Sequence, residues 1–582
     1  MTFYRKSLIY IAIMAIGLVC FAPPARAAAQ PVYAAHTMVA SQNGHASQAG
    51  VEVMRQGGNA VDAAVATGFA LAVVHPQAGN LGGGGFMLIR MADGSTHFID
   101  YRETAPAAAT ANMYLDAHGN VAADASLYGY KAIAVPSSVA GLAYAQKKFG
   151  KLPLTAVMQP AIKLARDGFV LSHFDAEDFR DPHLAEFPES KRIFQSDVSR
   201  GGGYYEEGDI FRQPELARTL ERIAQNPDDF YHGALAHELA ATVQQGGGLI
   251  TERDLASYAV KERPVVTGSY RGYDIITSPP PTSGGVMMLE ALNILEPVPL
   301  RAMGNRSADS IHWTVEAFRR AYMDRAEFMG DPDFVKVPVA QLLDRKYADK
   351  WRESIDPNRA TPSEALKRPG FEELDRSART HPEAAHHESP QTTHYSVVDE
   401  QGNAVAVTTT LNNTFGSSVT AQGLGFLLND EMDDFTSKPG APNYYGLIQG
   451  AANAIAGGKR PLSSMAPTIV VKDGKPFLVL GSPGGSRIIT TVANILMGVI
   501  DYGLNIQEAV NAPRFHHQWM PDAIGMESAG FSPDTQHMLE ARGYRLEFRD
   551  SWSNGECIMI DLKTGERMGA SDPREGGRAI GY

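Results

Sequence analysis

The feature that most limits how this chain can fold is a series of β-hairpins in its last third. Three turn sequences lie between short apolar runs there, namely Gln401-Gly402-Asn403, Asp473-Gly474 and Lys563-Thr564-Gly565. The flanking runs predict strands at 393–399 and 404–411, at 468–472 and 476–480, and at 557–562 and 567–570. A further Asp93-Gly94 turn joins strands expected at 86–90 and 96–101. Hairpins of this kind build antiparallel sheets, and such sheets need helices to cover their apolar faces.

Several segments have the composition and period of those helices. Helices are expected at 60–74, 157–166, 214–224, 286–295 and 487–500. Charged residues alternate along 317–328 with a helical period, which predicts a helix whose charged face meets solvent. The fold class is therefore α+β.

Composition excludes several classes of protein. The 582 residues are 44% hydrophobic and 20% charged, which is ordinary for a globular chain and unlike a disordered, collagen-like or coiled-coil protein. The net charge of −13 argues against a nucleic-acid partner, since such proteins need basic surfaces to displace phosphate counterions.

The N-terminus has the pattern of a secretory signal peptide. Arg5 and Lys6 precede an apolar run at 8–22, and Ala25-Arg26-Ala27 has the small residues of a cleavage site. The alternative is a retained anchor, but the run is shorter than the ~20 residues of a membrane span. We expect cleavage after residue 27, a periplasmic or secreted protein, and no membrane contact once the signal is removed.

Removal of the signal leaves one cysteine. Cys20 lies in the leader, so Cys557 cannot form an intrachain disulfide or a cysteine-based zinc site. Cys557 could be a nucleophile, but it opens an apolar strand and is better interpreted as a buried structural thiol.

Residues 367–391 break the pattern of the chain. They are rich in charge, proline and histidine and have no apolar period. The histidines His381, His386 and His387 could bind a metal, but nothing in the pattern fixes a ligand geometry, so a mobile linker is the better interpretation.

Thr392 stands where that linker meets the strand at 393–399. A hydroxyl is a poor nucleophile without a base, and no Gly-x-Ser-x-Gly elbow is present. If the chain is cut before Thr392, its own α-amine, with a pKa of about 7.7–8.0, becomes the base. The alternative is that two threonines simply favour a strand.

Two further motifs carry possible chemistry. The turn Gly481-Ser482-Pro483-Gly484-Gly485-Ser486 joins a strand to a helix and could build an oxyanion hole from backbone N–H groups, or be an ordinary tight turn. The acids of 431–434, upstream of 459–467, could hold a metal, but no histidine set accompanies them, so a solvated turn or an amine-binding acid is preferred. The glycines at 82–85 precede a strand, so the dinucleotide-binding fingerprint fails.

Taken together, the motifs resemble those of the bacterial γ-glutamyltranspeptidase family over nearly the whole mature chain. The resemblance is carried by 40–41, 57–64, 79–86, 100–106, 281–285, 392–434, 460–467, 482–487, 511–519 and 569–574. It implies an N-terminal-nucleophile hydrolase, a four-layer αββα sandwich of two stacked antiparallel sheets. It also implies self-cleavage between Gln391 and Thr392 into a large subunit, 28–391, and a small catalytic subunit, 392–582, which form one intertwined heterodimer.

The resemblance assigns a role to each site residue. Thr392 attacks glutathione and other γ-glutamyl compounds, Thr410 orients it, and the N–H groups of Gly484 and Gly485 hold the oxyanion. The remaining assignments are Arg102, Ser463 and Ser464 for the α-carboxylate of the glutamyl group, and Asp434, Asn412 and Glu431 for its α-ammonium. Glu431 is a mild variation at a position that takes Gln or Glu in the family, and we expect it to tighten amine binding.

The resemblance also implies the remaining partners. Acceptors are water or amino-acid and dipeptide amines, and no metal or organic cofactor is expected. Residues 438–450, with Tyr445, resemble a lid over the glutamyl group, although a long surface loop is the alternative.

Three other functions remain open from the sequence. A glutaryl-type acylase acting on β-lactam side chains would not need Asp434, and a poly-γ-glutamate hydrolase would not suit a lid. A non-catalytic periplasmic amino-acid-binding protein would not need Thr392, Thr410 and the glycine turn.

Overall fold

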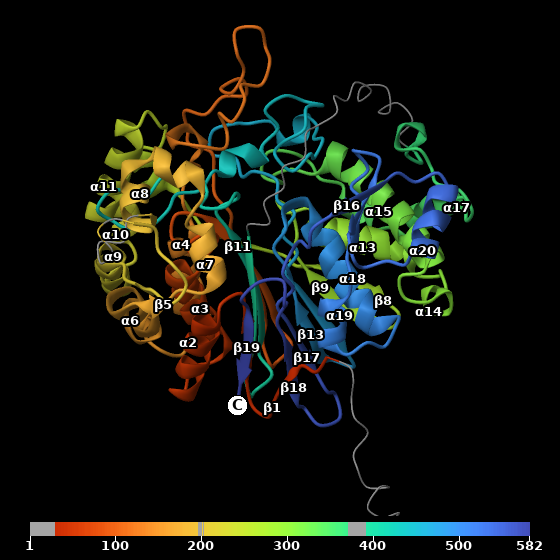
Figure 1. The fold of residues 1–582 in the computed structure, drawn as a ribbon, viewed down its shortest axis with the longest axis horizontal. Helices are drawn as coiled ribbons and strands as arrows, with labels where there is room; N and C mark the ends of the chain where they lie inside the picture. The colour runs from red at the N-terminus through yellow and green to blue at the C-terminus, as the bar shows by residue number, and fades with distance from the viewer. Residues whose placement is uncertain (1–28, 196–200, 202, 371–391) are drawn as a thin grey trace, which may run out of the picture.

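The computed structural model describes residues 29–195, 201, 203–370 and 392–582, so the predicted signal segment lies outside it. Within these residues, two antiparallel seven-stranded sheets stand side by side at the centre of the molecule (Figure 1). The first has the order β1 (Val32–Ala34), β18 (Arg567–Ala570), β17 (Cys557–Ile560), β13 (Lys475–Leu480), β12 (Thr468–Lys472), β9 (Tyr273–Thr277) and β8 (Val266–Tyr270). The second has the order β19 (Arg578–Gly581), β2 (Met38–Ser41), β10 (Thr393–Val398), β11 (Ala404–Thr410), β3 (Gly84–Arg90), β4 (Thr96–Tyr101) and β7 (Lys261–Arg263).

All four predicted hairpins are confirmed. The pairs β3–β4, β10–β11, β12–β13 and β17–β18 are each antiparallel across the expected turns. In β10–β11 the register sets Thr393 opposite Thr409. Because the strands run in opposite directions, that register brings Thr392 next to Thr410.

The central strands of the second sheet bury both of their faces. In β3, Met87 and Ile89 belong to one core, while Phe86 and Leu88 belong to the core shared with the first sheet. Since successive side chains point to opposite faces, such a strand must lie between two covering layers.

Helices supply the outer layers. α2 (Gly44–Arg55), α3 (Ala60–Val74) and α4 (Ser138–Phe149) contact the second sheet, and α13 (Gly284–Leu295) with α18 (Ile488–Ile500) covers the first (Figure 1). The predicted four-layer αββα sandwich of the α+β class is therefore confirmed.

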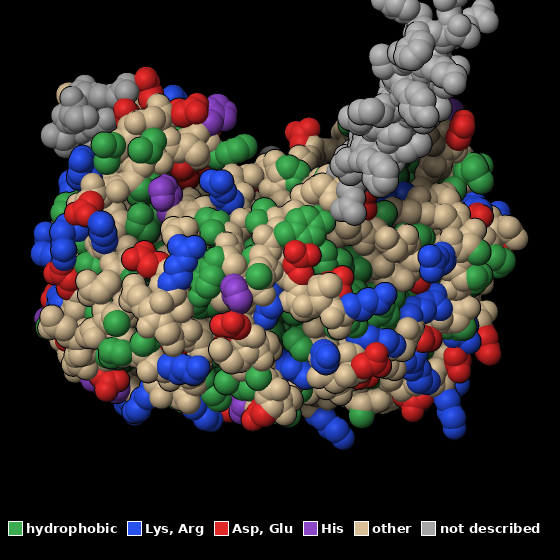
Figure 2. Space-filling model, turned by 90° about the horizontal axis from the view of Figure 1, so that it is seen from below, with side chains coloured by type: hydrophobic (Ala, Val, Ile, Leu, Met, Phe, Trp, Pro, Cys, Tyr) green, Lys and Arg blue, Asp and Glu red, His purple; other side chains and the backbone are tan. Residues whose placement is uncertain are grey.

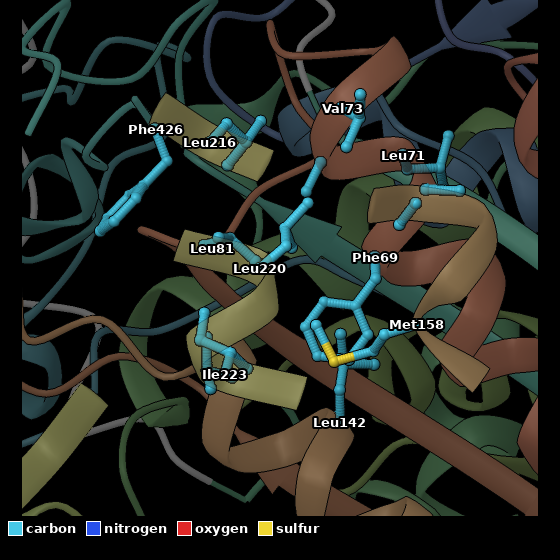
Figure 3. Close-up of a cluster of buried hydrophobic side chains, with 14 of the residues drawn as sticks. Phe69, Leu71, Val73, Leu81, Leu142, Met158, Leu216, Leu220, Ile223 and Phe426 are labelled. Carbon is cyan, nitrogen blue, oxygen red and sulfur yellow. The ribbon is translucent and has the colours of Figure 1, made fainter. Parts of the chain in front are cut away.

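α3 shows why these residues form these elements. Asn59 and Asp62 form a capping box at its start, and every residue of the helix is buried. Phe69, Leu71 and Val73 of α3 pack with Met158 and with Leu220 of α9 (Pro214–Gln225), as Figure 3 shows. The predicted helix at 157–166 becomes α5 (Leu154–Val157) and α6 (Gln159–Asp167).

The prediction for 317–328 is half wrong. The helix exists as part of α15 (Ala308–Phe328), but its face is not solvated, since Arg319, Arg320 and Arg325 are each at most 2% exposed. Arg320 pairs with Glu316 at 2.6 Å inside the protein. Burial of these charges is tolerated because they have polar partners inside the protein. A helical period of charged residues is the same whether that face is buried against such partners or exposed to solvent.

The packed structure extends into the predicted linker. Arg368 is buried and its Nε lies 2.8 Å from Asp324 of α15. Residues 371–391, which include the histidines and Gln391, lie outside the described residues.

Cys557 is buried at the start of β17, as expected for a structural thiol, and burial raises its pKa above the ordinary range. On the face seen in Figure 2, basic and acidic side chains are interspersed and form no single-sign field. None of the helices in the described ranges has both the length and the hydropathy of a membrane span.

Candidate active site

Thr392 and Thr410 meet at the end of the β10–β11 hairpin. Their hydroxyl oxygens are 3.2 Å apart, and both residues are buried. The Thr410 oxygen also accepts the N–H of Asn412 at 2.8 Å. This second bond fixes the Thr410 hydroxyl beside Thr392, where it can orient a nucleophile.

A small cavity of about 20 Å³ opens beside these hydroxyls. It gathers ten of the residues predicted from sequence, which come from segments far apart in the chain: Arg102, Thr392, Thr410, Asn412, Glu431, Asp434, Tyr445, Ser463, Ser464 and Gly485. Leu447, Met465, Ser486 and Ile488 also line it and were not predicted. Gly484 directly precedes Gly485 but is not among the lining residues.

The glycine turn contains two successive residues with positive φ angles, a conformation that glycine adopts far more easily than other residues. The φ angles of Gly484 and Gly485 are +127° and +52°, and the chain then enters α18 through a short 3-10 turn, Gly485–Arg487. Backbone in this geometry at a helix start forms anion-binding concavities. A Cβ on Gly485 would collide with a ring carbon of Tyr445, so the turn and the predicted lid fit closely.

Gly485→Ala is therefore expected to lower kcat/KM by about 10- to 100-fold, because the turn or Tyr445 must shift and small misplacements in a site are costly. Gly474→Ala is the matched control, since Gly474 also has a positive φ but has open space around its Cβ position. Steady-state kinetics on both variants checks this, and equal effects would contradict it.

Arg102 is fully buried after β4 and is surrounded by acids. It contacts Asp434, lies 2.5 Å from Glu431, and is 3.7 Å from Glu103. Its Nε also donates to the carbonyl of Pro461 at 3.3 Å. The two residues predicted to bind opposite ends of the glutamyl head thus bind each other in this structure. A zwitterion can replace that pair, ammonium to Asp434 and carboxylate to Arg102, without leaving a buried charge unpaired.

Glu431 and Glu103 are both fully buried beside Arg102. Burial raises the pKa of Glu431 well above its ordinary value and that of Glu103 to about 7, with Arg102 opposing both shifts. The raised pKa makes it easier for Glu431 to keep its proton, and a protonated carboxyl resembles the amide of glutamine. The expectation that Glu431 tightens amine binding stays a prediction.

Glu431→Gln is expected to keep kcat/KM near pH 7 within roughly threefold. A carboxyl whose pKa is raised on folding destabilises the protein as pH rises above its unfolded pKa, by about 1.4 kcal/mol for each pH unit until the folded pKa is reached. The variant should therefore gain thermal stability over wild type at pH 8 and gain little at pH 4–5. Thermal unfolding at both pH values tests this, with the exposed Glu52→Gln as control; a variant less stable at both would contradict it.

Tyr445 holds the predicted lid segment closed over the cavity. Its hydroxyl donates to the carbonyl of Asn412 at 2.8 Å, and its own carbonyl accepts Gln518 Nε2 at 3.1 Å. The ring is 3% exposed. Tyr445 and Leu447 of this segment line the cavity, whereas residues 438–439 are exposed at the surface.

Ser463 and Ser464 also line the cavity. The Ser463 hydroxyl accepts the N–H of Met465 at 3.1 Å, and the Ser464 hydroxyl accepts Arg325 Nη2 at the same distance. Arg325 was missed in the sequence because its helix was expected to face solvent. Glu103 was also not predicted as a residue of the site. Its place directly after Arg102 in the sequence could have indicated it.

Among the described residues, no group of three or more His, Cys, Asp or Glu is arranged to hold a metal ion. The acids at 431–434 instead bind groups within the protein. Asp433 accepts the Ser126 hydroxyl at 2.7 Å, and the preceding Asp430 accepts Asn412 Nδ2 at 3.1 Å.

Comparison with known proteins identifies relatives that match nearly the whole chain. The chain is 52% identical to the glutathione hydrolase proenzyme of Escherichia coli strain K12, covering 94% of this chain and 91% of that one. It is 48% identical to the glutathione hydrolase proenzyme of Pseudomonas sp. strain A14, covering 98% and 99%. A crystal structure of a cephalosporin acylase from Bacillus halodurans superposes with a TM-score of 0.81 at 27% identity, over 97% of this chain and 98% of that one. The family model described as gamma-glutamyltranspeptidase matches residues 46–582, so the chain belongs to the γ-glutamyltranspeptidase family.

Proposed function

We propose that this protein is a glutathione hydrolase and γ-glutamyltransferase that matures by cleaving itself before Thr392. The observation that carries the proposal is the 3.2 Å contact of the Thr392 and Thr410 hydroxyls beside a cavity lined by Arg102 and Asp434. A nucleophile and one charge of each sign are what a γ-glutamyl donor requires. The relatives named glutathione hydrolase proenzyme support the same activity.

Maturation begins with the Thr392 hydroxyl. Its oxygen attacks the carbonyl carbon of Gln391, and the peptide nitrogen leaves as the α-amine of Thr392, giving an ester. Water then hydrolyses the ester, which releases the carboxylate of Gln391 and a free Thr392. The products are a large subunit, 28–391, and a small subunit, 392–582, which remain together because β10 and β11 lie inside a sheet with β2 and β3.

Catalysis then uses the new α-amine as base. It takes the proton of the Thr392 hydroxyl while the oxygen attacks the γ-carbonyl carbon of the donor. The N–H groups of Gly484 and Gly485 hold the oxyanion, a contribution of about 3–4 kcal/mol per donor. The leaving amine receives the proton, and the γ-glutamyl ester passes to water or to an amino-acid or dipeptide amine.

The glutamyl head is held by its two charges. Asp434, with Asn412 and Glu431, binds the ammonium, and Arg102 with the serines at 463–464 binds the carboxylate, because guanidinium and carboxylate form paired hydrogen bonds. Tyr445 covers the bound group and limits water. The leader pattern supports secretion to the periplasm or beyond.

The decisive experiment incubates the purified protein with glutathione and measures glutamate and cysteinylglycine, together with the intact masses of its chains. We expect two chains and at least as much cysteinylglycine as glutamate, since transfer of the γ-glutamyl group to an amine releases cysteinylglycine without glutamate. One intact chain with no turnover would overturn the proposal. Activity lost after dialysis against EDTA and restored by zinc would overturn the cofactor-free mechanism.

The rate should fall as pH drops below the pKa of the Thr392 amine, because the protonated amine cannot accept the hydroxyl proton. An α-amine titrates at about 7.7–8.0 when unperturbed. A kcat/KM profile that stays flat from pH 5 to 9 would argue against this amine as the base.

A further inference from the structure

Arg325 is a buried cation at the wall of the active-site cavity with an unusual set of partners. It is 2% exposed on α15, and no carboxylate pairs with it among the described ion pairs. Its Nη1 has no hydrogen-bond partner within the described part of the chain. A buried guanidinium in this state is costly unless a ligand or solvent compensates it. Burial lowers its pKa to about 10, so it remains charged at neutral pH.

The partners it does have are serines of the pocket and of the adjoining turn. Nη2 donates to the Ser464 hydroxyl at 3.1 Å, and Nε donates to the Ser283 hydroxyl at 2.9 Å. Ser283 in turn donates its hydroxyl and its backbone N–H to the carbonyl of Ser463, at 2.7 and 2.8 Å. One guanidinium therefore anchors both serines that line the cavity.

The direction of these bonds matters. Because Ser464 accepts a hydrogen bond from Arg325, its own hydroxyl hydrogen is available to donate elsewhere. Ser464 lines the cavity, so that hydrogen can meet an acceptor placed there. An acceptor that also carries negative charge would relieve the uncompensated guanidinium.

Arg102 cannot supply this charge alone. Its guanidinium already forms an ion pair with Asp434 and also lies close to Glu431 and Glu103, so its charge is already offset. Arg325 lies behind the serines, where Asp434 acts on its charge without forming an ion pair with it, so this second guanidinium is still available to a carboxylate.

We propose that Arg325 is a positioning residue that makes the pocket selective for acyl groups bearing an α-carboxylate. It acts through Ser464 and Ser463, which it holds as donors toward that carboxylate. This inference rests on the proposed function and names the determinant of its donor specificity.

The test compares three anilide substrates on Arg325→Gln. γ-Glutamyl anilide carries both charges, glutaryl anilide lacks the ammonium, and 4-aminobutanoyl anilide lacks the carboxylate. We expect kcat/KM to fall by about 30- to 1000-fold on the two carboxylate-bearing substrates, mainly through KM, and by less than about threefold on 4-aminobutanoyl anilide. Equal losses on all three, or no loss on any, would overturn the inference.

Arg320→Gln is the matched control, because Arg320 is also buried on α15 but bonds Glu316 and Ser354, outside the pocket. Its effect should be equal on the three substrates. Mass spectrometry of each variant measures self-cleavage separately from turnover.

If Arg325→Gln fails to mature, Arg325→Lys carries the test. Lysine keeps the charge but cannot bond both serines with a planar fork, so a selective loss of about tenfold on the carboxylate-bearing substrates is expected. An unselective loss with lysine would overturn the inference. A wild-type protein inactive on γ-glutamyl anilide would overturn the proposed function itself, which is a distinguishable result.

Discussion

Thr392→Ala is expected to remain one uncleaved chain with no measurable hydrolysis of glutathione. The substitution removes the oxygen that attacks Gln391 and also the oxygen that would attack the donor, so both maturation and turnover are lost. Mass spectrometry of the purified variant and a sensitive γ-glutamyl anilide assay measure the two effects. Because Cys557 is buried and unpaired, wild type should separate into two chains on a denaturing gel without reductant.

Thr392→Ser is the matched control, since serine keeps the nucleophilic oxygen and loses only a methyl group. It should still cleave and retain activity, at a lower rate. If Thr392→Ala is still cut between 391 and 392, an external protease performs the cleavage and self-processing is refuted.

Asp434→Asn is expected to lower kcat/KM on γ-glutamyl anilide by about 30- to several-thousand-fold, which corresponds to roughly 2–5 kcal/mol for removing one partner of a buried charge pair. The variant should mature normally, because Arg102 keeps its contact with Glu431. Glutaryl anilide lacks the α-ammonium, so in wild type it leaves the Asp434 carboxylate without an ammonium partner. The substitution removes that unpaired carboxylate, so any weak activity on glutaryl anilide should be unchanged or improved. This difference separates a γ-glutamyl enzyme from a glutaryl acylase, a distinction that a shared fold cannot make.

Asp433→Asn is the control for that experiment. Asp433 is the neighbouring acid, but it accepts the Ser126 hydroxyl at 2.7 Å and the N–H of Tyr444 at 3.3 Å, outside the cavity beside Thr392. Its effect should be similar on both substrates. If Asp434→Asn also lowered both equally, Asp434 would support the fold and would not bind the ammonium.

Much of the fold was predictable because its signals are local. The hairpins are identified by the residues of their turns, and the capping box that begins α3 spans only four residues of sequence. The end of the β10–β11 hairpin is local too, which is why Thr392 could be identified before any tertiary contact was known. That the site residues lie together was expected only from the resemblance of the motifs to a known family. Local sequence patterns did not predict it.

The environment of the charged groups could not be predicted in the same way. Arg102 and Asp434 are 332 residues apart in sequence, and nothing in either segment indicates that they touch. The alternating charges of α15 have the same helical period whether they face water or buried partners, so the prediction of a solvated face was wrong. The raised pKa of Glu431 arises from burial, which only the packed structure defines.

The sequence by itself therefore determined the hairpin strands, the main helices and the position of the candidate nucleophile, because these follow from turn residues, capping and apolar periodicity within short segments. Only the tertiary structure decided which charges are buried, which of them pair, and that Tyr445 closes on Gly485. The physical reason is that burial and ion pairing are properties of segments brought together from distant parts of the chain. Arg325 shows the difference most clearly, since an apparently solvated residue becomes the anchor of two serines in the pocket.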